Sequence, residues 1–179
     1  PGRARWSRIS KSAPAGQRRW CCLSYLADAL KNGGRPDASL PFFEQAATQA
    51  RADAEAGGDD AQQAWGHLAV ITGNWAIALV MNGELDAARQ RKLDSAEAER
   101  QAGRPAIHVI ASELEALRID IMQGEVAAAL PAVETRLAQI EAWWQRHSAG
   151  QRVPEAPDAE ILARAFIAAF DIATDAHFA

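Results

Sequence analysis

Apolar residues recur every three or four positions along most of the chain, in runs that end at glycines. The stretch 26–46, "LADALKNGGRPDASLPFFEQA", carries such residues on both sides of a Gly-Gly turn. This spacing places apolar side chains on one face of an α-helix. Alanine dominates the apolar residues, which favours helix further. The pattern therefore predicts an all-α chain of about seven helices, paired antiparallel across short glycine turns.

One pattern occurs three times: an apolar helix, a glycine, and a second helix that begins with alanines. The glycines are Gly34, Gly83 and Gly124, and in the first and third copies a Leu-Pro pair follows at the same distance. Glycine ends helices because it adopts the left-handed conformation without a Cβ penalty. Pro41 and Pro131 are expected near the first turn of the second helices, where a missing amide hydrogen costs little. The chain is thus predicted to be an array of internal repeats.

These repeats divide the chain. We expect a basic leader or linker at 1–19 and a helical repeat domain at 20–179, with units at about 20–56, 60–102 and 105–147 and a partial unit at 158–179. The leader contains six basic residues and no acidic one, and it lacks sustained helical periodicity. We therefore expect it to be dispensable for folding. The partial unit looks like a first helix without its second.

The first unit resembles the tetratricopeptide repeat family in the residues around its glycine turn, and the later units resemble it less fully. The matching positions are Leu23, Leu26, Ala27, Leu30, Gly34, Phe43 and Ala46 in the first unit, Trp75, Ala76, Leu79, Gly83 and Ala88 in the second, and Ala116, Leu117, Gly124 and Ala129 in the third. The glycines are 49 residues (34 to 83) and 41 residues (83 to 124) apart. The family period is about 34 residues, so the helices are expected to be extended. The resemblance implies a right-handed solenoid of stacked helix pairs whose first helices line a concave groove.

Such a groove holds a peptide or a helix of a partner protein, so we expect a protein-binding scaffold. Family members that grip the C-terminal carboxylate of a chaperone carry lysine, arginine and asparagine at set positions. Of the equivalent residues here only Asn74 matches, which argues against such a clamp. The residues expected to line the groove are Asp28, Lys31, Asn74, Met81 and Arg118. The alternative function is a regulatory or sensor repeat segment of a larger multidomain signalling or effector protein.

No local motif indicates catalysis. The sequence contains no phosphate-binding loop, no dinucleotide-binding glycine motif and no metal-binding histidine spacing. Asp171, Asp175 and His177 come closest to a cation site, but acids at this spacing are common on helix surfaces. We expect no enzyme activity, no metal and no cofactor. Cys21 and Cys22 diverge by about 100° on a helix, so we expect two small buried hydrophobic residues rather than a disulfide.

The charge and hydropathy of the chain limit its partners and its location. The net charge of the chain is −4. Without the basic leader, the remaining chain is more negative still, which argues against nucleic acid as the main partner. No early segment has the apolar core of a signal peptide. The longest apolar run, Trp75–Met81, is too short to cross a bilayer. We expect a cytoplasmic protein that does not enter a membrane.

Two aromatic features generate further expectations. In the segment 131–147, Val133, Leu137, Ile140 and Trp144 share one helical stripe, so the neighbouring Trp143 is expected at its margin or exposed. In the last segment, apolar surface is expected around a helix that no following helix covers, at Ala163, Phe166, Ile167, Phe170, Ile172 and Ala173, with Phe166 and Phe170 as the largest of these side chains. We expect these two phenylalanines to support self-association.

Overall fold

The computed structural model describes the backbone of residues 19–178, and the side chains of this range except those at 164, 168 and 175–178. The described part contains seven helices and no strand, which confirms the all-α prediction. The helices are α2 (Arg19–Asn32), α3 (Pro36–Glu55), α4 (Ala61–Met81), α5 (Leu85–Gln101), α6 (Ala106–Met122), α7 (Val126–Ser148) and α8 (Ala159–Phe178). Residues 1–18 of the expected leader lie outside the described range, and so do the expectations made for them.

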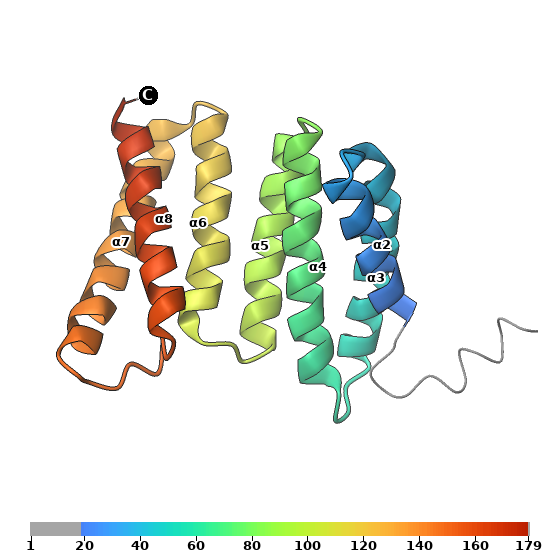
Figure 1. The fold of residues 1–179 in the computed structure, drawn as a ribbon, viewed down its shortest axis with the longest axis horizontal. Coiled ribbons are helices and arrows are strands. Elements are labelled where there is room, and N and C mark those ends of the chain that lie inside the picture. Colours follow the sequence, from blue (N-terminus) through green and yellow to red (C-terminus); the bar gives the residue numbers. More distant parts are fainter. Residues whose placement is uncertain (1–18, 179) are drawn as a thin grey trace, which may run out of the picture.

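The helices stand in one row, each packed against the next in chain order (Figure 1). We call α2, α4, α6 and α8 the first helices and α3, α5 and α7 the second helices. The first helices all run in one direction, and the second helices return in the other. Neighbouring first helices also meet directly, α2 with α4 and α6 with α8. The row therefore presents the first helices together on one face, in front in Figure 1.

The three predicted glycine turns share one geometry. Gly34, Gly83 and Gly124 have φ of 75°, 80° and 86°, which confirms the predicted left-handed conformation. The amide that follows each glycine donates to the carbonyl five residues back, at 3.0 Å from Arg35 and at 2.9 Å from Glu84 and Glu125. This is the hydrogen bond of a Schellman cap. The same turn thus reverses the chain within each complete helix pair.

The placement of the two prolines differs from the prediction. Pro41 and Pro131 are each the sixth residue of their helix, α3 and α7, and so lie beyond the first turn. The second helices begin earlier than expected, directly after the glycine turn. Each proline leaves the carbonyl four residues before it, of Asp37 or Ala127, without a helical donor. Both of these residues are exposed, so water is available to those carbonyls.

Two large apolar clusters hold the row together. One joins α2, α3 and α4 around Trp20, Phe43 and Leu68. The other joins α6, α7 and α8 around Leu114, Ile140 and Leu162. A smaller cluster of Leu79, Ala88 and Ile119 connects them through α4, α5 and α6. The core thus consists of three clusters along the row, the smallest of which spans α4, α5 and α6.

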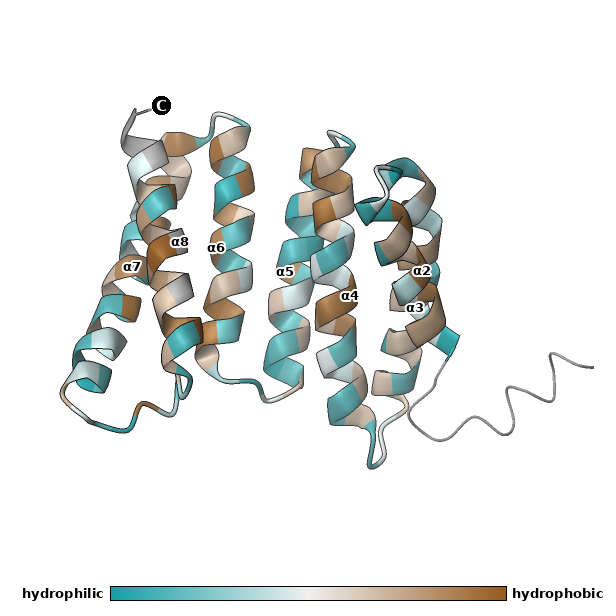
Figure 2. Ribbon diagram, viewed as in Figure 1, coloured by the Kyte–Doolittle hydropathy of each residue, from teal (hydrophilic) through white to brown (hydrophobic). Residues whose placement is uncertain are grey.

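Helix α5 packs almost entirely through small residues. Its buried side chains are Ala88, Ser95, Ala96 and Ala98, and its remaining surface is largely hydrophilic (Figure 2). The Ser95 hydroxyl donates a 2.8 Å hydrogen bond to the carbonyl of Ala69 in α4. A Cβ at Gly73 of α4 would lie only 3.5 Å from that hydroxyl oxygen. Small side chains on both helices thus let α4 and α5 approach closely.

The tryptophan prediction for α7 is wrong. Trp143 is 6% exposed and belongs to the core, whereas Trp144 is 39% exposed. The connection from α7 to α8 supplies the physical reason, because its buried Val153 and Ala156 join the same cluster as Trp143. The prediction assumed that α7 buries the same face along its whole length. Near its C-terminal end the helix instead buries the side of Trp143, against the α7–α8 connection.

Helix α4 is long and apolar enough, by length and composition, to cross a bilayer. This differs from the expectation based on the run Trp75–Met81 alone. Half of its most apolar window is buried against the other helices. The core helix of a helical stack meets the same criteria, so this property by itself does not place the chain in a membrane.

Replacement of Gly83 by valine should lower the free energy of unfolding by about 1 kcal/mol or more, because a β-branched residue would have to adopt a left-handed conformation. Urea unfolding followed by circular dichroism measures the change. Gly73→Ala is the matched control, since its backbone is helical and Ala favours a helix interior over Gly by about 0.5–1 kcal/mol. Equal effects of the two substitutions would contradict the assigned role of the Gly83 turn.

Candidate functional site

The exposed large hydrophobic residues gather on the first helices. Nine such residues are exposed in the described part of the chain, and eight of them belong to α2, α4, α6 or α8. They are Tyr25, Leu26, Val70, Ile77, Met81, Met122, Ile167 and Phe170, and the ninth is Trp144 of α7. The exposed large hydrophobic residues of the described chain therefore belong mainly to the four first helices, whose shared surface is here named the first-helix face.

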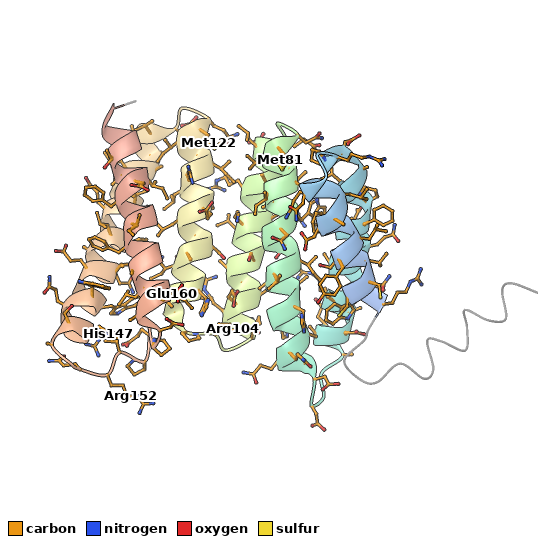
Figure 3. The ribbon with its side chains drawn as sticks, viewed as in Figure 1. Met81, Arg104, Met122, His147, Arg152 and Glu160 are labelled. Carbon is orange, nitrogen blue, oxygen red and sulfur yellow. The ribbon has the colours of Figure 1, made fainter. Side chains whose placement is uncertain are left out.

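The exposed residues of α4 form a stripe along the helix. Val70, Ile77 and Met81 are seven and four positions apart, a spacing that keeps them on one side. A helix rises about 1.5 Å per residue, so this stripe is about 16 Å long. Met81 and Met122 project from the same ends of α4 and α6 (Figure 3). They are 53% and 54% exposed, so an adaptable apolar surface lies at that end of the face.

The other end of the α4 stripe opens into a pocket. A cavity of about 550 Å³ is lined by Val70 together with Gln62, Gln63, Gly66 and His67 of α4 and by Ala102, Gly103 and Arg104 of the α5–α6 turn. Met81 lies at the upper edge of the row of helices and Arg104 at its lower edge (Figure 3). Val70 belongs to both the stripe and the pocket. The apolar stripe is therefore continuous with a polar pocket at its lower end.

Three of the predicted groove residues come together in one cluster. The Lys31 ammonium lies 2.9 Å from Asp28 Oδ1 and 5.9 Å from the centre of the Phe43 ring. The side-chain amide of Asn74 in α4 donates to Asp28 Oδ2 at 3.2 Å. The cluster ties α2 to α4. Lys31 is buried, so its charge is used inside the fold rather than at the surface.

A second lysine continues this cluster toward α6. Lys92 of α5 lies within the electrostatic range of Lys31 and of Glu115 in α6. Burial lowers the pKa of Lys92, Glu115 raises it, and Lys31 lowers it further. Lys92 thus lies between a positive charge of α2 and a negative charge of α6.

The remaining predicted residues lie apart from this cluster. Met81 and Arg118 are exposed on α4 and α6, and Arg118 lies one turn from Met122. Phe166 is partly buried and packs against the core cluster of α6–α8, while Phe170 is 56% exposed. Ile167, one turn before Phe170 on the same helix, is 60% exposed. The apolar surface of α8 is therefore formed by Ile167 and Phe170 rather than by both phenylalanines.

The cysteines and the acidic group near the end of the chain offer no metal site in the described part. Cys21 is half-buried and Cys22 is exposed, which corrects the expectation that both are buried. Adjacent helical positions diverge, so only one can turn toward the neighbouring helix. No group of three or more metal-binding side chains occurs among the described residues. Of the candidate cation group, Asp171 is exposed, and the side chains of Asp175 and His177 lie outside the described range.

The sequence interpretation missed most of the apolar stripe and the whole pocket. Val70 and Ile77 share the helical phase of Met81, so their spacing could have identified them. Arg104 had no such signal, because it follows a turn glycine and reaches α4 only through the fold. A Cβ at Gly66 would lie 3.3 Å from Arg104 Nη2. Contact between a turn and a helix of the same unit is invisible in a linear pattern.

Asp28→Ala should lower the free energy of unfolding by about 1–3 kcal/mol, because it leaves the buried Lys31 ammonium without its carboxylate and Asn74 without its acceptor. Denaturant melts give the difference. A second substitution, Lys31→Met, should recover part of the loss since it removes the unpaired charge. A single variant that unfolds at the wild-type midpoint would show that the cluster does not stabilise the fold.

Comparison of the chain with models of known protein families, with curated proteins and with solved structures found no match. The functional assignment therefore rests on the geometry of the chain itself.

Proposed function

We propose that this chain is a protein-interaction module that binds a peptide or a helix of a partner protein along the first-helix face. The observation that carries this proposal is the distribution of exposed apolar residues, eight of nine on the first helices. Exposed apolar residues scattered at random would divide between both sides of the row. Their concentration on the first helices is typical of surfaces that a partner covers.

The layout of the face suits an elongated ligand. The stripe Val70–Ile77–Met81 is about 16 Å long, which is about five residues of extended chain. Antiparallel helix pairs in a row, joined by repeated glycine turns, also fit the solenoid proteins that hold peptides on their first helices. We propose a tetratricopeptide-like scaffold on these grounds. Its setting would be the cytoplasm, without enzyme activity and without membrane or nucleic acid as its main partner.

A second candidate function is a regulatory or sensor repeat segment within a larger protein. It is supported by the outer surface of α8, where Ile167 and Phe170 are both more than half exposed. In a helical array such a surface packs against the next repeat. A further helix pair or a second copy of this chain would serve equally well as the covering partner.

Peptides selected from a display library should bind the first-helix face. We expect Ile77→Glu and Met81→Glu to weaken selected peptides at least tenfold, because each substitution places a charge within the buried contact. Fluorescence anisotropy with labelled peptides measures the affinity. Trp144→Glu is the matched control, since it changes the one exposed large hydrophobic residue on a second helix. Peptides that respond to Trp144→Glu but to neither α4 variant would place the binding surface elsewhere.

Self-association, if it occurs, should use the outer surface of α8. The double variant Ile167→Glu and Phe170→Glu is expected to abolish dimers and leave the melting temperature nearly unchanged, because both side chains are exposed. Phe166→Glu should instead lower the melting temperature, because Phe166 packs against the core. Sedimentation velocity and thermal melts test the two effects. A wild-type chain that stays monomeric at high concentration would exclude this surface as a dimer contact.

A further inference from the structure

The pocket at the lower end of the α4 stripe has a single charged group. Its polar lining consists of Gln62, Gln63, His67 and Arg104. Burial, and secondarily the neighbouring Arg104, lower the pKa of His67, so the imidazole stays neutral near pH 7. Arg104 is then the only charged side chain among the lining residues. The lining of the pocket thus carries one positive charge, and Glu99, the ion-pair partner of Arg104, lies beside the pocket.

The Arg104 guanidinium has donors to spare. Its side chain donates no hydrogen bond to any residue in the described part of the chain, and its nearest carboxylate oxygen is Glu99 Oε2, 3.7 Å from Nε. Burial raises the pKa of Glu99, while His108 and Arg104 lower it, so Glu99 and Arg104 form a loose ion pair through Nε that leaves the other guanidinium nitrogens available. About half of the Arg104 side chain is exposed. An arginine carries five N–H donors in a planar fork that matches a carboxylate.

Two glycines keep the pocket open. A Cβ at Gly66 would lie 3.3 Å from Arg104 Nη2, and one at Gly103 would lie 3.0 Å from Gln62 Nε2. That amide in turn donates a 2.9 Å hydrogen bond to the carbonyl of Ala102, which holds the α5–α6 turn against α4. Gly66 lies inside a helix, where Ala would favour the fold. The space is therefore kept for the guanidinium at a cost to helix propensity.

We propose that Arg104 is a subsite of the first-helix face that binds an acidic side chain of the partner segment, placed beside apolar residues that lie on Val70, Ile77 and Met81. This inference rests on the proposed function. A carboxylate matches the single positive charge of the pocket, and the fork of Arg104 can hold it through two parallel hydrogen bonds. The partner segment is accordingly an acidic group followed by apolar side chains spaced over about 16 Å.

The test is a double-mutant cycle on peptides selected by display against the wild-type chain. The selected peptides should carry Asp or Glu at one end of an apolar run. Replacement of that acid by its amide should weaken binding to the wild type about tenfold, the expected loss for a charge-assisted pair. On Arg104→Gln the same replacement should have no effect. Arg152→Gln, which changes an exposed arginine of the α7–α8 connection outside the pocket and the first-helix face, is the control.

Gly66→Ala gives a second readout that a purely structural role would not produce. The added Cβ would lie 3.3 Å from Nη2 and push the guanidinium out of its position, so the variant should weaken the preference for the acid while melting at or above the wild-type temperature. Peptides that depend on Ile77 and Met81 but are insensitive to Arg104→Gln would overturn the inference and leave the proposed function standing. Selections that yield no peptide sensitive to the α4 stripe would overturn both.

Discussion

The left-handed glycine at the end of each first helix is the constraint on which the rest of the structure depends. The amide after Gly34, Gly83 and Gly124 closes the same hydrogen bond in each case, so each turn sends the second helix back along the first. Identical reversals place every first helix parallel to the others, and the row then has one face made of first helices and one made of second helices. A face four helices wide arises from three turns of a few residues each.

The same constraint explains why the two halves of a unit differ so strongly. A second helix such as α5 is held against α4 through Ser95 and alanines, and most of its surface is hydrophilic. The first helices are apolar on two sides, one toward the core and one outward. Neighbouring helices cover the inward side. The exposed apolar residues on the outward side are not buried against any helix of the described chain. These residues are a cost to solubility unless a partner covers them.

The helices and their turns could be predicted from the sequence because the signals that determine them lie within short segments. Helical periodicity and a glycine that adopts positive φ are properties of short segments, so helix number, class and turn position were all predictable. The errors occurred where distant residues decide. Trp143 is buried by Val153 and Ala156 of the following connection, and Lys31 is drawn inward by Asp28 and Phe43. Arg104 belongs to a turn but lies against Gly66, nearly forty residues earlier in the chain.

The polar cluster between α2 and α4 gives the first-helix face a selectivity that an apolar surface alone would lack. Asp28, Lys31 and Asn74 satisfy one another, so a partner gains no hydrogen bonds from them unless it breaks existing ones. Such a cluster separates the apolar residues of α2 from the stripe on α4 and discourages a broad, unspecific apolar contact. Arg104 is the opposite case, because its donors remain available at the end of the stripe. Under the proposed function, a ligand with apolar side chains but no acid would cover the stripe and remove water from the guanidinium. The hydrogen bonds lost to water would not be replaced, at a cost of about 1–3 kcal/mol. Orientation along the face would then be set by one charge at one end, with the methionines at the other end adapting to whatever side chains reach them.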